Sequence, residues 1–232
     1  LEDSEIFDEL LGHEDNVNCV AISYNNKYIV SGSSDNTLKV WSIETLCARE
    51  EATIKVHKDE VELVVIIKTQ VVSGDSSGVI HIWDLINFTH IHEISVEASI
   101  LCMAVTNDNR YLVAGCDDCS IRFWSFTQIG EDNEDIFYAH ESAVMGICVS
   151  SDNEFLVSSS EDASVKIWAL SQYQGHKLNI TGFRESIYNI DLSPDDNYLV
   201  TAGEDCAIGI WDVRGEPVFQ RQIEGHEDWI SS

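Results

Sequence analysis

Short apolar segments separated by polar turns recur along the whole chain. The first of these stretches has apolar runs at residues 17–23 (VNCVAIS), 28–33 (YIVSGS) and 38–42 (LKVWS), with turns at 24–27 (YNNK) and 34–37 (SDNT). Apolar runs of this length, bounded by Asn, Asp, Gly and Ser, predict short β-strands joined by turns. A more polar strand then leads to the next stretch, and no segment has a helical period. The pattern predicts an all-β array of four-stranded units.

Five segments of similar sequence each end at a tryptophan. They read SGSSDNTLKVWS, SGDSSGVIHIWD, AGCDDCSIRFWS, SSSEDASVKIWA and TAGEDCAIGIWD, and they place the tryptophans at Trp41, Trp83, Trp124, Trp168 and Trp211. The spacings between these tryptophans are 42, 41, 44 and 43 residues. A fixed period near 40 residues indicates stacked structural units, which we number repeats one to five.

A Gly-His pair before the first strand and a Trp-Asp pair at the end of the third strand accompany this period. They stand at Gly12-His13, Trp83-Asp84, Trp211-Asp212 and Gly225-His226. With these pairs the chain resembles the WD40 repeat β-propellers over essentially its whole length. The resemblance implies one WD40 propeller domain over residues 1–232, built from four-stranded antiparallel blades with strands a to d.

Incomplete repeats flank the five complete ones. Residues 5–11 (EIFDELL) look like the last strand of a preceding repeat, and residues 225–232 (GHEDWISS) begin a new one. Propellers of this family more often close with six or seven blades, so the resemblance implies that the chain is part of a six-bladed, seven-bladed or longer array. The alternative is a ring of five blades in which the extra strand seals the gap.

The resemblance also implies a structural set of four side chains in each repeat: a His, a Ser or Thr, an Asp and the Trp. A buried indole N–H needs an acceptor and a buried carboxylate needs donors, so such a set satisfies its members together. Because the set recurs from repeat to repeat, we interpret it as structural and not as a hydrolase triad. The complete sets are His13, Ser31, Asp35 and Trp41 in repeat one, and His140, Ser158, Asp162 and Trp168 in repeat four.

The other three repeats depart from this set. Repeat two has His57, Ser73 and Trp83, with Ser77 in place of the Asp. Repeat three keeps Asp118 and Trp124 and has Ala114 at the Ser position. Repeat five has Thr201, Asp205 and Trp211, with Phe183 at the His position. We expect weaker local rigidity in these repeats.

The charge of the chain narrows the classes of partner. Lys and Arg number 13 against 41 Asp and Glu, which gives a formal net charge of -28. Such a field repels nucleic acid and anionic membranes and favours basic partners. No apolar window approaches the roughly 20 residues that span a bilayer. The acidic start of the chain lacks a signal-peptide layout, so we expect an intracellular, cytoplasmic protein, with cytoskeletal, ciliary and nuclear locations left open.

Cysteine and histidine spacing gives no cofactor or metal site. Seven cysteines at irregular spacing argue against a disulfide framework, and Cys116 and Cys119 form a C-x-x-C with no second pair. We interpret them as two reduced thiols beside a turn. His90 and His92 share one side of a strand, which predicts an exposed polar edge because no third ligand is evident.

One end of the blades is the candidate interaction face. Strand direction alternates, so the d–a and b–c connections share an end, and propellers of this family usually bind partners there. The candidate residues flank the start of strand a or precede the turn Asp, and they are Glu60, Glu62, Leu101, Asp117, Met145, Glu161, Tyr188, Glu204 and Trp229. Apolar anchors with an acidic rim predict a Lys- or Arg-bearing peptide as ligand. The alternative is that the acids reflect the global charge and the apolar residues only pack between blades.

The sequence predicts a non-catalytic scaffold that binds proteins, such as subunits of a large complex. It contains no phosphate-cradling Gly-rich loop, no H-E-x-x-H and no G-x-S-x-G. An alternative comes from Trp211-Asp212-x-Arg214, which resembles the box by which some WD40 proteins bind an adaptor of cullin-type ubiquitin ligases. In that alternative Asp212 and Arg214 would contact the adaptor, and the protein would be a substrate receptor.

Overall fold

The computed structural model describes residues 9–43, 49–126, 134–170 and 175–230. For residues 175–177 it describes the backbone and not the side chains. The chain divides into two compact units, Leu1–Glu97 and Ala98–Ser232, and each is considered by itself. Within the described ranges there are five four-stranded antiparallel sheets and no α-helix. The prediction of an all-β chain of four-stranded units is therefore confirmed. We call the sheets blades one to five.

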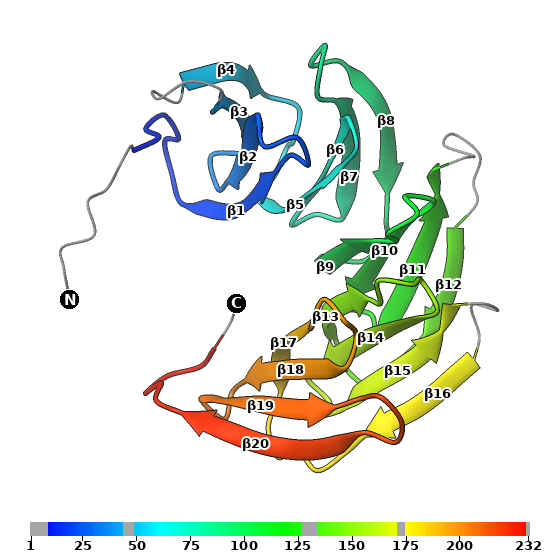
Figure 1. The fold of residues 1–232 in the computed structure, drawn as a ribbon. Coiled ribbons are helices and arrows are strands. Elements are labelled where there is room, and N and C mark those ends of the chain that lie inside the picture. Colours follow the sequence, from blue (N-terminus) through cyan, green and yellow to red (C-terminus); the bar gives the residue numbers. More distant parts are fainter. Residues whose placement is uncertain (1–8, 44–48, 127–133, 171–174, 231–232) are drawn as a thin grey trace. The chain divides into compact units, whose positions relative to one another are not determined.

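The N-terminal unit holds blades one and two (Figure 1). Each blade is a meander whose strands pair in chain order. Blade one contains β1 (Val17–Ile22), β2 (Tyr28–Ser33), β3 (Leu38–Ser42) and β4 (Arg49–Ile54); blade two contains β5 (Val61–Ile67), β6 (Gln70–Asp75), β7 (Val79–Asp84) and β8 (His90–Ser95).

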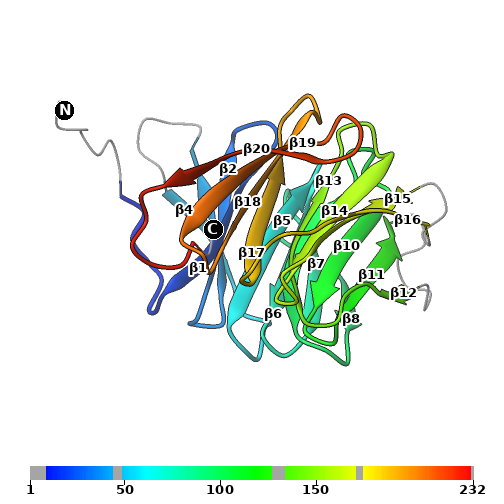
Figure 2. The same cartoon turned by 90° about the horizontal axis from the view of Figure 1, so that it is seen from below.

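The C-terminal unit holds blades three, four and five, and their strands also pair in chain order. Figure 2 shows the sheets from a second side. Blade three contains β9 (Ile100–Val105), β10 (Tyr111–Cys116), β11 (Ser120–Ser125) and β12 (Glu134–Tyr138). Blade four contains β13 (Val144–Val149), β14 (Phe155–Ser160), β15 (Val165–Ala169) and β16 (Gly175–Ile180). Blade five contains β17 (Ile187–Leu192), β18 (Tyr198–Gly203), β19 (Ala207–Asp212) and β20 (Val218–Glu224).

The second and third strands of each blade are the most deeply buried. In blade one, Val30, Leu38 and Val40 are fully buried and join a cluster with Val61 of β5. In blades one and three, close packing against the next blade leaves no room for a side chain at one point of the second strand. A Cβ on Gly32 would lie 2.5 Å from the Val61 side chain, and one on Gly115 would lie 2.6 Å from the Val144 side chain. Glycine therefore lets the next blade approach at these two matching positions.

The turn between the second and third strands uses a left-handed residue in every blade. Gly78 fills this place in blade two, but Asn36, Cys119, Ala163 and Cys206 fill it in the others, with φ between 57° and 69°. The C-x-x-C pair thus spans a turn: Cys116 ends β10, Cys119 is the left-handed residue, and both are free thiols.

The expected incomplete repeats have no strand among the described residues. Residues 5–8 of the first lie outside the described ranges, and residues 9–11 form no strand. At the other end, residues 225–230 continue from β20 without strand structure. Ile230 is nevertheless buried, and its N–H donates to the carbonyl of Gly203 at 3.1 Å.

Candidate functional site

A β-bulge lies at the start of the first strand in all five blades. In blade four, Val144 pairs with Ser160 and Gly146 pairs with Ser159, so Met145 is the extra residue. The register breaks at the same point in the other four blades. A bulge leaves one residue outside the ladder and redirects its side chain. The five bulge residues are Asn18, Glu62, Leu101, Met145 and Tyr188.

A second repeated contact brings the b–c turn to the same edge. In each blade the residue after the second strand donates its backbone N–H to the carbonyl of the residue just before the first strand. The donor and acceptor pairs are Ser34 and Asn16 (2.9 Å), Ser76 and Glu60 (3.0 Å), Asp117 and Ser99 (3.0 Å), Glu161 and Ala143 (3.2 Å), and Glu204 and Ser186 (3.0 Å). The predicted acidic residues 117, 161 and 204 therefore lie beside the bulges of their own blades.

In the N-terminal unit this edge is polar and connects the two blades. Ser34 donates its hydroxyl to Glu60 Oε2 at 2.8 Å, and the Asn18 amide donates to Ser34 Oγ at 3.0 Å and to the Val61 carbonyl at 3.2 Å. Burial and the nearby Glu60 carboxylate raise the pKa of Glu62. Two close carboxylates disfavour each other's charge, so a cation placed here would relieve that repulsion.

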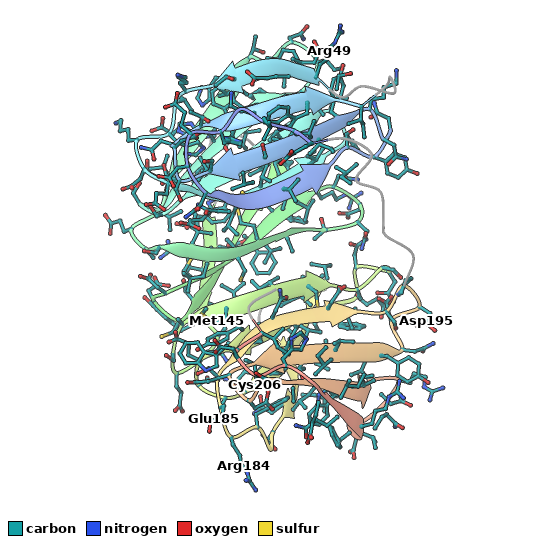
Figure 3. All side chains as sticks on the ribbon, turned by 90° about the vertical axis from the view of Figure 1, so that its left-hand side faces the viewer. Arg49, Met145, Arg184, Glu185, Asp195 and Cys206 are labelled. Atoms are coloured by element: carbon teal, nitrogen blue, oxygen red, sulfur yellow. The ribbon has the colours of Figure 1, made fainter. Side chains whose placement is uncertain are left out.

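In the C-terminal unit the first strands β9, β13 and β17 are neighbours, and so their bulge residues share one edge. Leu101, Met145 and Tyr188 are half-buried, whereas Asp117 and Glu161 are exposed. The Trp229 ring packs 6.0 Å from the Tyr188 ring and is 60% exposed. Figure 3 shows Met145 at one end of the strands and Asp195 at the opposite end.

The sets of blades one and four are hydrogen-bonded throughout. In blade four, His140 Nδ1 lies 3.0 Å from Asp162 Oδ2 and His140 Nε2 lies 2.7 Å from Ser158 Oγ, while Trp168 donates its indole N–H to Ser158 Oγ at 2.8 Å. The contacts in blade one are the same, at 2.9, 2.7 and 2.8 Å for His13–Asp35, His13–Ser31 and Trp41–Ser31. The carboxylate accepts from Nδ1, which leaves Nε2 to accept the Ser hydroxyl proton.

Blade two requires a correction, because its acid is present two residues earlier than expected. His57 Nδ1 lies 2.9 Å from Asp75 Oδ2, and Ser77, the expected replacement, only donates its hydroxyl to Asp75 Oδ1 at 2.7 Å. Asp75 ends β6 two residues after Ser73, so both side chains lie on the same face of the strand. The remaining difference is Trp83: its indole nitrogen is buried and has no hydrogen-bond partner among the described residues.

A histidine cluster lies beside Trp83. His81 Nδ1 lies 3.0 Å from His90 Nε2, and the His81 ring centroid is 4.6 Å from that of His57. His90 is exposed, but its ring also packs 4.7 Å from Trp83. Within the described parts of the chain, no three His, Cys, Asp or Glu side chains are arranged to hold a metal ion.

These buried groups determine how stability should change with pH. Burial lowers the pKa of His57, and burial together with the His57 ring lowers the pKa of His81 to about 4. An unfolded His titrates near 6.5, so between about pH 6.5 and 4 the unfolded chain binds more protons than the folded one. We expect the free energy of unfolding to fall over this window, by at most about 3 kcal/mol from His81.

Denaturant titrations followed by tryptophan fluorescence at pH 7, 5.5 and 4 would measure this loss. The His81→Gln variant should flatten the change between pH 6.5 and 4, whereas His226→Gln, at an exposed position, should not. Below about pH 4 a further loss is expected from Asp162. Burial opposes its ionisation, but hydrogen bonds from Ser164, the Glu141 N–H and His140 outweigh burial and lower its pKa. A pH profile unaffected by His81→Gln would contradict the assignment.

Blade three lacks the histidine and the serine of the four-residue set, and an arginine not predicted from the sequence pairs with its aspartate. Arg122 is buried, and its guanidinium donates to Asp118 Oδ2 at 2.6 Å, Glu134 Oε1 at 2.9 Å and Ser120 Oγ at 3.1 Å. A signal was present in the sequence, since the residue two positions before each tryptophan is basic in four of the five repeats: Lys39, His81, Arg122 and Lys166. In repeat five this residue is Gly209.

The two residues of the adaptor-box alternative are engaged with each other. Arg214 donates its Nε–H to Asp212 Oδ1 at 2.9 Å, and its Nη2 also donates to the same carboxylate. The guanidinium lies 5.6 Å from the centroid of the Tyr198 ring. Hydrogen bonds from Arg214 lower the pKa of Asp212 to about 2.

Comparison with known proteins identifies one family and several partial relatives. The sequence profile of the family described as WD domain, G-beta repeat, matches residues 5–42, 88–125, 132–169 and 170–212.

None of the residues that the structure describes forms a helix of the length and apolar character needed to cross a membrane.

Three relatives show how far the likeness extends. The WD repeat-containing protein 55 homolog of Dictyostelium discoideum is 28% identical over 136 residues, 57% of this chain and 32% of the relative. Target of rapamycin complex subunit wat1 of Schizosaccharomyces pombe is 28% identical over 117 residues, 49% of this chain and 36% of the relative. The intraflagellar transport protein 122 homolog of Danio rerio is 30% identical over 115 residues, 49% of this chain and 9% of the relative. The chain matches only 9% to 36% of their lengths.

Proposed function

Because the chain belongs to the WD40 repeat family, whose members generally mediate protein–protein interactions, we propose that it is a non-catalytic scaffold that binds basic segments of partner proteins. The observation that carries the proposal is the repeated pairing of a bulge residue with a turn residue at one edge of every blade. This edge presents side chains that the strand ladder does not need for pairing.

The composition of the edge supports a basic ligand. In the C-terminal unit, half-buried Leu101, Met145 and Tyr188 supply apolar contact area, and Asp117, Glu161 and Glu204 follow them on the adjoining turns. Half-buried apolar anchors with a charged rim are typical of interaction hot spots. The net charge of -28 adds a long-range attraction for Lys- and Arg-rich segments, which raises the association rate.

The names of two relatives support membership of a multiprotein assembly. One is a subunit of a target of rapamycin complex and another is an intraflagellar transport protein. The role of substrate receptor for a ubiquitin ligase has weaker support, because the Arg214 guanidinium and the Asp212 carboxylate are already hydrogen-bonded to each other, which leaves fewer of their polar atoms for an adaptor.

Charge reversal at the edge tests this proposal. The double variant Glu161→Lys/Glu204→Lys should reduce the recovery of partners in affinity purification by about tenfold or more, since it replaces attraction with repulsion. Its matched control is Glu154→Lys/Glu216→Lys, which makes the same charge change on exposed residues of the same two blades, at turns of the opposite end. Both variants should melt at the wild-type temperature. Equal recovery of every partner by the two variants would reject the proposed edge.

A further inference from the structure

Blade five lacks two side chains that fill the same place in other blades. Phe183 stands where blades one, two and four have the histidine of the set, and Gly209 stands where the other four blades have a basic residue. In those blades the basic side chain is held within the blade. Lys39 donates to Glu50 at 2.7 Å and Thr53 at 2.8 Å, and Lys166 donates to the carbonyl of Ala139 at 2.7 Å.

A cavity of about 950 Å³ opens where these side chains are missing. Gly209 and Trp211 line it together with Phe183, Thr201, Asp205 and Phe219. A Cβ on Gly209 would lie 2.6 Å from Thr201 Oγ1 and 3.0 Å from Trp211 Nε1. The position of the missing basic residue therefore faces the hydrogen-bonded Thr201–Trp211 pair, whose own bond is 3.2 Å.

Three aromatic rings line the cavity. The Trp211 ring centroid lies 5.0 Å from those of both Phe183 and Phe219, and Phe219 is 49% exposed. Aromatic faces attract cations, and the planar guanidinium also stacks on them. Because aromatic rings accept only weak hydrogen bonds, a strong and directional acceptor for the guanidinium must be an acidic residue nearby.

Asp205 is that residue. Among the described residues it accepts only the N–H of Ala207, at 3.2 Å, and the histidine that would bind its other oxygen is absent. Glu185 and Glu204 also line the cavity, so three carboxylates are available to a ligand there. The equivalent Asp35 accepts four hydrogen bonds, from His13, the Glu14 N–H, and the hydroxyl and N–H of Thr37.

Blade three shows which group pairs with the corresponding aspartate elsewhere in this chain. Like blade five it lacks the histidine of the set, and there Arg122 places its Nη2 2.6 Å from Asp118, the counterpart of Asp205. Blade three also has Ala114 where blade five has Thr201. Blade three thus supplies its own arginine from the position that is Gly209 in blade five. Arg184 also lines the cavity of blade five, but it is exposed and, among the described residues, forms no ion pair with Asp205.

We propose that the cavity of blade five binds an arginine side chain of a partner protein, which stacks on Trp211 and pairs with Asp205 as Arg122 pairs with Asp118. This inference rests on the proposed function only for the partner's basic character. It names a single residue type and a single cavity, and Glu161 does not line that cavity.

The test titrates the full chain with the peptide acetyl-Gly-Arg-Gly-amide and follows the tryptophan indole N–H signals by NMR. The Trp211 signal, assigned with Trp211→Phe, should shift and saturate, while those of Trp41 and Trp168 should not. The same peptide with citrulline, a neutral arginine analogue, should bind at least about tenfold more weakly, because the charge-assisted pair is lost.

Two variants complete the test. Asp205→Asn should weaken the arginine peptide about tenfold or more, and it should still fold because the amide oxygen can accept the Ala207 N–H. Asp195→Asn makes the same charge change at the opposite end of the strands (Figure 3) and should have no effect. The double variant Thr201→Ala/Gly209→Arg copies blade three and should abolish peptide binding by filling the cavity.

The proposal is overturned if the arginine peptide does not saturate the Trp211 signal, if citrulline binds equally well, or if Asp205→Asn has no effect. The Glu161→Lys variant distinguishes failure of the arginine-cavity proposal from failure of the proposed interaction edge. Peptide binding that persists in Glu161→Lys and disappears in Asp205→Asn supports the cavity, even if partner recovery shows the edge to be wrong.

Discussion

Replacing Asp75 with alanine is expected to lower the free energy of unfolding by about 3–5 kcal/mol. Asp75 and His57 have side chains that are 1% and 0% exposed, and they lie 2.9 Å apart. Without the carboxylate, the buried His57 Nδ1 loses its acceptor, and the part-buried N–H groups of Ser77 and Val79 lose theirs as well. Denaturant unfolding followed by circular dichroism measures the loss.

Ser77→Ala is the matched control, because repeat spacing predicts Ser77 at the position that an Asp occupies in blades one and four. Its hydroxyl makes one hydrogen bond to Asp75, so its removal should lower the free energy of unfolding by about 1 kcal/mol. If Ser77→Ala were as destabilising as Asp75→Ala, the assignment of Asp75 as the acid of blade two would be wrong.

Trp168→Ala is expected to lower the free energy of unfolding by about 3–5 kcal/mol. The indole is buried between blades three and four, where it contacts Phe137 at 4.9 Å between ring centroids and joins the cluster of Phe123 and Val144. Removing it leaves a cavity and also takes the indole donor from Ser158. Thermal and denaturant unfolding of the variant would measure the effect.

A pair of phenylalanine variants separates the hydrogen bond from the packing. Trp168→Phe keeps an aromatic ring and removes the bond to Ser158, so it should lose about 1 kcal/mol more than Trp83→Phe. Trp83 is buried to a similar degree, but its indole N–H has no partner among the described residues. Equal losses in the two variants would show that the bond to Ser158 contributes nothing measurable to stability.

The apolar pattern and the spacing of the tryptophans were sufficient to predict the fold. Runs such as 28–33 and 38–42 alternate with turn residues so regularly that each strand begins and ends close to where the pattern places it. Counting along the repeats also selected Glu62, Leu101, Met145 and Tyr188, all of which are bulge residues. This was achievable because a bulge at a fixed place in each blade keeps the count constant.

Side-chain hydrogen-bond networks were less predictable, because they depend on which groups each side chain can contact and not on its position in the repeat. Asp75 takes the place of an acid expected two residues later, since residues two apart on a strand face the same side. Arg122 and the cavity at Gly209 were not predicted, for a related reason. A repeat comparison that follows four marker residues does not show what fills the space between them.

The bulges allow the molecule's surface to diversify without disturbing its framework. The residue before each bulge is always β-branched, Val17, Val61, Ile100, Val144 or Ile187, whereas the bulge residue itself is Asn, Glu, Leu, Met or Tyr. Because the extra residue takes no part in strand pairing, exchanging it should leave the neighbouring backbone unaltered. Each blade thus offers one position at which a substitution can change the surface without changing the strand pairing, and new binding preferences can arise one blade at a time.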